Sequence, residues 1–215
     1  ANELYLKRLV AGGYDGVYEI GKMFRNEGMD RSHNPEFTSM EIYVAYKDYV
    51  WMMEMVETML HRIALATLGT SVATVGDQEI DFKPPFKRIS MIYAIQEYAD
   101  IDISGMDEEA LRSVCKQLHI DVDPSMGKGK LIDEIFGEKV EPHLIQPTYI
   151  MDYPIEMTPL AKKHRSKEGL VERFELFINR SEIANAYTEV NDPIDQRARL
   201  EEQLTLAARG DDEAM

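Results

Sequence analysis

The sequence has few of the features that mark secreted, membrane or zinc-binding proteins. It contains one cysteine, Cys115, among 215 residues, which excludes an internal disulfide framework and fits a reducing cytosol. No apolar run approaches the roughly 18 residues of a membrane span, and the first residues do not resemble a signal peptide. No group of cysteines and histidines has zinc-site spacing. These absences favour a cytoplasmic globular protein that does not enter a membrane.

Basic residues are also scarce relative to acidic ones. The 24 lysines and arginines are outnumbered by 39 aspartates and glutamates, so the net charge is −15. A chain this acidic repels a phosphate backbone overall, and a nucleic-acid contact would require a local basic patch. Otherwise the charge serves solubility. The length is sufficient for one large core and a smaller lobe.

Hydrophobic periodicity and turn residues divide the chain into helices and strands. We expect helices at 3–11, 49–68, 90–99, 107–118, 128–141 and 192–209. We expect strands at 17–25, 36–46, 171–178 and 183–190, a small hairpin within 70–85, and a further strand after 148. Asp48 and Gly69 are residue types that cap the two ends of the 49–68 helix. Regular crossover helices between the strands are missing, which predicts an α+β fold with an antiparallel sheet and flanking helices.

The same pattern predicts three segments: a first core part at 1–87, a helical insert at 88–145 and a second core part at 146–215. Alternation along the strands then predicts which side chains share a face. In 36–46 we expect Thr38, Met40, Ile42, Val44 and Tyr46 to face the core, opposite Phe37, Ser39, Glu41 and Tyr43. In 171–178 we expect Phe174, Leu176 and Ile178 to face the core, opposite Arg173, Glu175 and Phe177.

In 183–190, Asn185, Tyr187 and Glu189 share a face, and Ala184 and Ala186 lie behind it. Three strands therefore present carboxylates among aromatic and amide side chains on one side of the expected sheet. Such a surface is either an ordinary solvated face or a binding site. A solvated face usually carries more lysine and threonine and fewer large aromatic residues, which favours a site.

Two stretches then point to a family. The run Phe24-Arg25-Asn26-Glu27, a loop, and His33-Asn34-Pro35-Glu36-Phe37 together resemble motif 2 of the class II aminoacyl-tRNA synthetases. The Asn-Pro-Glu-Phe form is similar to the lysine-specific branch, as are residues 173–177, 181–193 and 210–215. The resemblance covers nearly the whole chain. It includes no counterpart of the family's motif 1, motif 3 or anticodon-binding barrel, so we expect a catalytic-core fragment.

The resemblance implies an activity: ATP-dependent activation of lysine to lysyl-adenylate, followed by transfer of the lysyl group to tRNA(Lys). It implies Mg²⁺ as the metal and a homodimer as the state of the intact enzyme. We expect the fragment alone to be inactive, because part of the ATP clamp and the dimer interface belong to the motifs not found here.

The resemblance also implies roles for single residues. Arg25 would be catalytic, bridging the α-phosphate of ATP and the carboxylate of lysine. The expected ATP contacts are Arg25, Glu27, His33, Asn34 and Phe37, and Asp30 and Arg31 would approach the tRNA acceptor end. The expected lysine contacts are Glu3, Glu41, Tyr43, Asn185, Tyr187 and Glu189. Glu175 and Glu182 would hold magnesium. Independently, a desolvated ammonium must be paired, so two converging glutamates argue for a cationic substrate.

Two alternatives remain open. A paralogue could ligate a lysine-like amino acid to a lysine of a translation factor through a nearly identical pocket, with small Ala184 admitting a modified substrate. A non-catalytic scaffolding derivative could keep the fold and bind only partners. The presence of Arg25, Glu175 and Glu182 counts against the second alternative.

Overall fold

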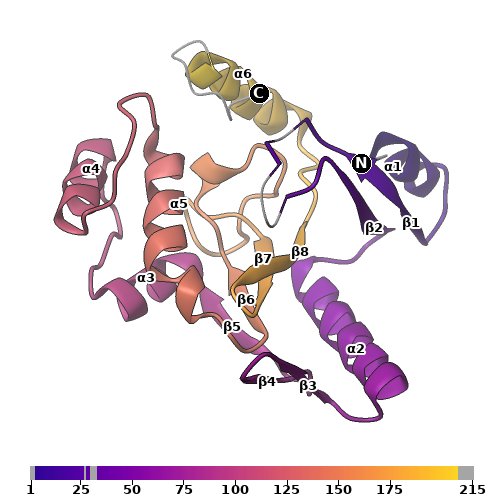
Figure 1. Ribbon diagram of the computed structural model, residues 1–215. Helices are drawn as coiled ribbons and strands as arrows, with labels where there is room; N and C mark the ends of the chain where they lie inside the picture. The colour runs from indigo at the N-terminus through magenta and orange to yellow at the C-terminus, as the bar shows by residue number, and fades with distance from the viewer. Residues whose placement is uncertain (1–2, 27, 30–32, 208–215) are drawn as a thin grey trace. The chain divides into compact units, whose positions relative to one another are not determined.

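The computed structural model describes residues 3–26, 28–29 and 33–207. It consists of two compact units, and the boundary between them in the sequence lies between Lys47 and Asp48. Figure 1 labels the elements of both units.

The first unit is a helix followed by a hairpin. Helix α1 spans Glu3–Ala11, and strands β1 (Gly16–Phe24) and β2 (Glu36–Val44) pair antiparallel from Gly16 opposite Val44 to Phe24 opposite Glu36. The backbone N–H of Arg25 donates to the carbonyl oxygen of Pro35 at 3.0 Å, which extends the pairing by one residue on each strand. The predicted helix and both predicted strands are confirmed within one or two residues.

The face of the hairpin that packs in this unit is the reverse of the predicted one. Met23 and Leu6 are buried, and Met23 lies opposite Phe37, on the same face as Glu41 and Tyr43. On the other face Met40 is 39% exposed, and Tyr46 beyond the strand is fully exposed. The prediction of a core face through Thr38, Met40, Ile42, Val44 and Tyr46 is therefore wrong for this unit. Both faces of β2 carry large apolar residues, so alternation alone does not decide which one packs.

The second unit is built on a four-stranded sheet in the order β5-β6-β7-β8. The strands are β5 (Lys87–Ser90), β6 (Thr148–Met151), β7 (Arg173–Ile178) and β8 (Ser181–Tyr187). Its helices are α2 (Tyr49–Leu68), α3 (Met91–Ala99), α4 (Glu108–Gln117), α5 (Lys128–Lys139) and α6 (Pro193–Ala207), with short 3₁₀ turns η1 (Glu141–His143) and η2 (Ile155–Met157). Strands β3 (Val72–Val75) and β4 (Gln78–Asp81) form the predicted small hairpin.

The α+β prediction is confirmed, with one difference in the sheet. Strand β5 was not predicted, and it pairs parallel with β6, whereas β6–β7 and β7–β8 are antiparallel. The chain between β5 and β6 contains α3, α4 and α5, which supply the long crossover that a parallel pair requires. Figure 1 shows these helices on one side of the sheet and α2 on the other.

Two apolar clusters bury the two faces of β7. Phe174 and Leu176 pack with Tyr149 and with Met53 of α2, and Ala184 and Ala186 of β8 join this cluster. Phe177 packs on the opposite side with Phe136 of α5. The core faces predicted for β7 and β8 are confirmed. The α2 boundaries are also confirmed, since Asp48 accepts from the N–H of Trp51 and Gly69 ends the helix at a φ of 73°. Among the described residues, no helix has the length and apolar character to cross a bilayer.

A buried carboxylate ties the start of α2 to the chain before β7. Glu172 is 2% exposed and accepts from Arg165 through both oxygens, at 2.5 and 2.9 Å. Arg165 also donates to Asp48 at 2.8 Å. Burial alone would raise the pKa of Glu172, but hydrogen bonds from Arg165 and Thr188 outweigh burial and hold this pKa below its ordinary value.

We therefore predict that Arg165→Ala lowers the free energy of unfolding by about 2 kcal/mol, because it leaves a buried carboxylate short of donors. A lowered pKa in the folded state adds stability that is present above the ordinary glutamate pKa of about 4.3 and lost as pH falls below it. Urea titrations between pH 7 and pH 3 should show a smaller acid-dependent loss in the variant than in the wild type. Arg180→Ala is the control, since this exposed arginine donates only to a backbone carbonyl in the contacts we describe. Equal acid dependence in both variants would contradict the assignment.

Candidate active site

The expected ATP contacts gather at the loop end of the β1–β2 hairpin. The Arg25 guanidinium lies over the Phe37 ring, 5.5 Å from its centroid, as in a cation–π contact. Asn34 donates to the backbone carbonyl of Glu36 at 2.6 Å, which fixes the turn into β2, and His33 is exposed beside it. The structure thus brings Arg25, Asn34 and Phe37 together. The expectations for Glu27, Asp30 and Arg31 fall outside the described residues.

Three expected lysine contacts lie together on the packed face of the same unit. The Tyr43 hydroxyl donates to Glu41 at 3.2 Å. The Lys7 ammonium is 3.1 Å from a carboxylate oxygen of Glu3 and 5.4 Å from the centre of the Tyr43 ring. Glu3 and Lys7 are one helical turn apart on α1, so both reach the same side of the helix. This face already holds one primary ammonium, which is the functional group of a lysine substrate.

Glu19 is a further acid on this face, which the sequence reasoning missed. It lies directly opposite Glu41 in the β1–β2 pairing, so the two carboxylates emerge on one face. Like charges placed opposite each other weaken a strand pair by up to about 1 kcal/mol. The Glu19 carboxylate leans over Gly21, where an added Cβ would lie 3.8 Å from its oxygen. The hairpin register is the signal that identifies it.

The second unit holds the other expected contacts on β7 and β8. Glu175 lies opposite Asn185, and Arg173 lies opposite Tyr187, so all four share one face of the sheet. Glu182 lies opposite Phe177, because an irregularity at Leu176 and Phe177 shifts the register and leaves Ile183 without a direct partner. The shift places Glu182 on the Glu175 face. Glu189 is exposed just beyond β8, in an isolated bridge with Ala161.

Glu175 is held by three hydrogen-bond donors. Its carboxylate accepts from Arg173, from Asn185 at 3.4 Å and, through its other oxygen, from the Tyr153 hydroxyl at 2.7 Å. Burial, and then the charge of Glu175, raise the pKa of Tyr153 well above its ordinary value. Tyr153 therefore stays protonated and remains a donor to Glu175. Sequence reasoning missed Tyr153, since nothing in its own surroundings marks it.

Glu175 and Glu182 fit a magnesium ion only if it is shared with a nucleotide. Three donors occupy three of the roughly four lone-pair positions of the Glu175 carboxylate, which leaves about one for a cation. Within the described part of the chain, no three acids, histidines or cysteines are grouped as a metal site. Mg²⁺ in nucleotide sites takes one or two carboxylates and fills its remaining positions with phosphate oxygens and water. Glu175 and Glu182 would therefore be enough protein ligands for a magnesium ion that also binds a nucleotide.

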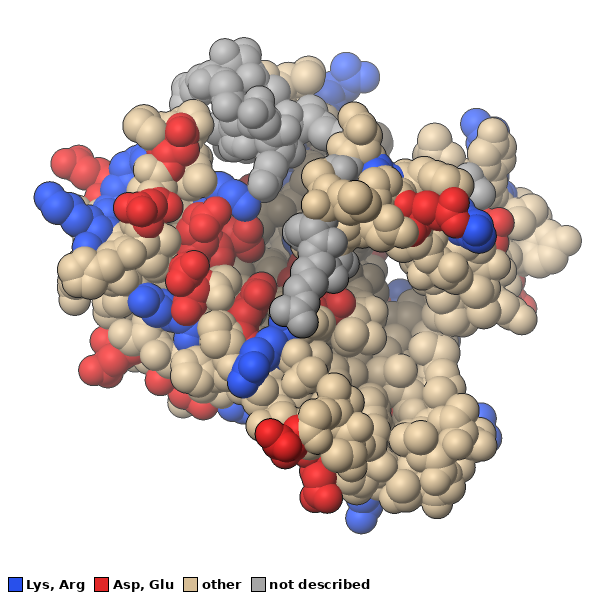
Figure 2. Space-filling view, viewed as in Figure 1, with Lys and Arg blue, Asp and Glu red and all other residues tan. Residues whose placement is uncertain are grey.

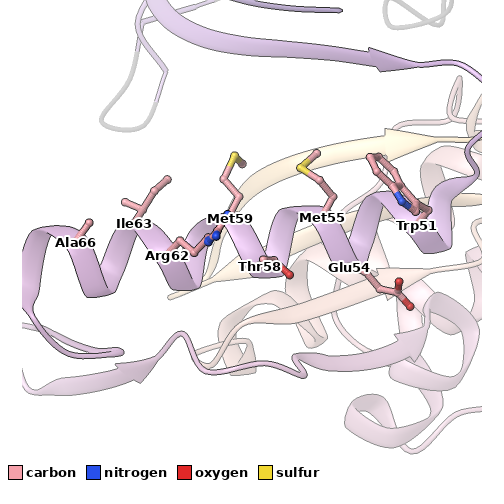
Figure 3. Close-up of a pocket in the computed structure, with 8 residues that line it drawn as sticks. All are labelled: Trp51, Glu54, Met55, Thr58, Met59, Arg62, Ile63 and Ala66. Atoms are coloured by element: carbon pink, nitrogen blue, oxygen red, sulfur yellow. The ribbon is translucent and has the colours of Figure 1, made fainter. Parts of the chain in front are cut away.

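The surface also has a groove that these side chains do not line. A groove of about 590 Å³ follows α2, and every residue that lines it belongs to that helix. Trp51, Met55, Met59 and Ile63 point to the same side of the helix in Figure 3. Figure 2 shows the surface over α2 as mostly uncharged, while acidic side chains gather over α4 and α5. The groove contains none of the expected ATP, lysine or metal contacts.

The sequence of the whole chain matches a known family. Residues 1–215, the entire chain, match the family of tRNA synthetases class II (D, K and N). The chain belongs to this family, which confirms the family resemblance read from motif 2.

Three curated relatives carry the name lysine–tRNA ligase. Over 215 residues the chain is 64% identical to the one from Porphyromonas gingivalis, 63% to that of Christiangramia forsetii and 57% to that of Azobacteroides pseudotrichonymphae. All of the chain is aligned in each case, and it spans 37%, 38% and 43% of the respective relatives.

The two acids expected to hold magnesium should differ in how much their substitution destabilises the fold. We predict that Glu175→Gln lowers the free energy of unfolding by about 1–3 kcal/mol, because Arg173 beside it is largely buried and loses its charged acceptor. Glu182→Gln, at an exposed position, should change stability by less than about 0.5 kcal/mol. Chemical denaturation without nucleotide or metal measures both. Equal effects of the two changes would show that the contacts of Glu175 are not formed.

Proposed function

We propose that the protein is a lysine–tRNA ligase, which uses ATP to activate lysine to lysyl-adenylate and transfers the lysyl group to tRNA(Lys). The observation that carries the proposal is the polar cluster in which Glu3 and the Tyr43 ring hold the Lys7 ammonium and the Tyr43 hydroxyl donates to Glu41. The relatives that bear this name support it. Because the chain spans less than half of their length, the activity is proposed for the full-length protein.

The first step requires alignment and charge neutralisation more than proton transfer. The nucleophile is a substrate carboxylate that is already ionised near neutral pH. Arg25 would hold this carboxylate beside the α-phosphate, since a guanidinium donates to two oxygens in a fixed geometry. Its place over Phe37 keeps it at the loop end of the hairpin, where Phe37 would stack on adenine. His33 and Asn34 would line the phosphate side, and Glu27 would accept from the adenine amino group.

Magnesium, when bound, would neutralise the phosphate charge that the attack and the departure of pyrophosphate redistribute. Glu175 and Glu182 would hold it from the shared face of β7 and β8. Tyr153 keeps one oxygen of Glu175 oriented, which leaves the carboxylate little rotational freedom.

Specificity for lysine follows from the cost of burying an ammonium without a counter-charge. Glu41 and Glu189 would pair with the ε-ammonium, and the Tyr43 oxygen would accept from it while the Tyr43 hydroxyl donates to Glu41. Tyr187 would pack against the methylene stem, and Asn185 would hold polar atoms of the substrate. Glu3 would take the α-amino group.

The remaining partners follow from the same assignment. The acceptor is tRNA(Lys), with Asp30 and Arg31 near its 3′ end, and the full-length enzyme acts as a cytoplasmic homodimer. The helical segment at 88–145 would serve as a scaffold between the two core segments.

Lysine-dependent exchange of pyrophosphate into ATP, followed by acylation of tRNA(Lys), tests the proposal in the full-length protein. We predict that Glu41→Gln lowers kcat/KM for lysine by about 30-fold or more, because a desolvated ammonium loses a charged partner. The KM for ATP should change little. Glu109→Gln, at an exposed position on α4, is the matched control.

Two results would overturn the proposal. Absence of lysine-dependent exchange in the wild-type protein would exclude the activity. Exchange followed by transfer to a lysine of a translation factor, and not to tRNA(Lys), would identify the paralogue instead.

A further inference from the structure

Arg173 contacts both an expected magnesium ligand, Glu175, and an expected lysine contact, Asn185. Its Nη2 donates to Oε1 of Glu175, and its Nε donates to Oδ1 of Asn185 at 3.3 Å. Its guanidinium stacks on the Tyr153 ring, 4.7 Å from the centroid. The Arg173 side chain is 15% exposed and that of Glu175 13%, so solvent screens their ion pair weakly.

These contacts form a closed ring. Asn185 donates through Nδ2 to the same Glu175 oxygen that Arg173 contacts, at 3.4 Å. Arginine has donors only, so the Asn185 oxygen must face Arg173 and its NH₂ group must face Glu175. Arg173 thereby sets the orientation of the Asn185 amide, and strand pairing holds all three residues on one face.

We propose that Arg173 is a positioning residue that couples the magnesium site to the lysine site through Glu175 and Asn185. The inference rests on the proposed function. The positive charge of Arg173 balances Glu175 before a metal arrives, and its Nε fixes the amide that faces the substrate. Neither role requires Arg173 to touch lysine or ATP.

Substitutions separate the two roles. Arg173→Lys keeps a positive charge beside Glu175 but lacks the fork that reaches Asn185 at the same time. We expect it to raise the KM for lysine about tenfold while the Mg²⁺ concentration for half-maximal exchange stays near that of the wild type. Arg173→Ala should raise both quantities. Arg180→Ala, in the turn between β7 and β8, is the control and should change neither.

A double-variant cycle tests the route through Asn185. Adding Asn185→Ala to Arg173→Ala should raise the KM for lysine by less than about twofold more, because the first change has already released the amide. Full additivity, or an unchanged KM for lysine in both Arg173 variants, overturns the coupling. A purely structural role would instead lower the melting temperature and the amount of active enzyme without changing either KM. If Arg173→Ala does not fold, Arg173→Lys alone decides between these outcomes.

Failure of the coupling and failure of the proposed function give different results. A wild-type protein without lysine-dependent exchange refutes the proposed function. An active wild type with unaffected Arg173 variants refutes only the coupling.

Discussion

The second unit depends on the pairing of β7 with a neighbour on each side. Antiparallel pairing with β6 and β8 fixes the register of β7 at both edges, and the two-residue period then assigns each side chain to a face. Phe174 and Leu176 fill the cluster beneath α2, which leaves Arg173 and Glu175 on the other face. A slip by one residue would place Glu175 in an apolar core, at a cost of several kcal/mol for an unpaired charge. Burial of the apolar face therefore determines where the polar residues emerge.

Much of this arrangement could be predicted from local pattern. The α2 boundaries followed from Asp48 and Gly69, and the core faces of β7 and β8 followed from apolar residues that recur at alternate positions, although Phe177 adds an apolar residue to the other face of β7. The hairpin in the first unit shows the limit of such reasoning. Both of its faces carry large apolar side chains, and the choice between them rests on where α1 packs, which is a tertiary contact. The parallel pairing of β5 and β6 joins segments separated by three helices, and no local pattern signals it.

Strand alternation also predicted which candidate site residues lie on one face, but not all of their contacts. Residues within one strand pair, such as Glu175 with Asn185 or Glu41 with Tyr43, are linked by alternation and register. Tyr153 lies 22 residues before Glu175, just after β6, where Asp152 adopts a φ of 58°. Its hydrogen bond to Glu175 depends on the path that the chain takes after β6, which strand alternation does not predict. Arg173 was visible in the sequence as a neighbour of Glu175, but its contact with Asn185 requires the β7–β8 register. Local sequence thus identified the acids better than the groups that hold them.

In the proposed function these acids receive cationic ligands, and the groups that hold them would keep their carboxylates in place for such ligands. In each unit an acidic set has a cation from the chain beside it: Lys7 with Glu3 in the first and Arg173 with Glu175 in the second. An internal cation lowers the repulsion that neighbouring carboxylates would otherwise impose on the folded state. The internal cation also weakens the attraction between the acids and an arriving ammonium or metal ion, because the arriving ion shares the carboxylates with a charge already present. Selectivity then depends on geometry as well as charge, since a ligand must reach oxygens that the internal cation leaves accessible. Tyr43 and Asn185 then contribute to selectivity as much as the glutamates do. Each donates to a glutamate oxygen and so determines which carboxylate oxygens stay accessible to a ligand.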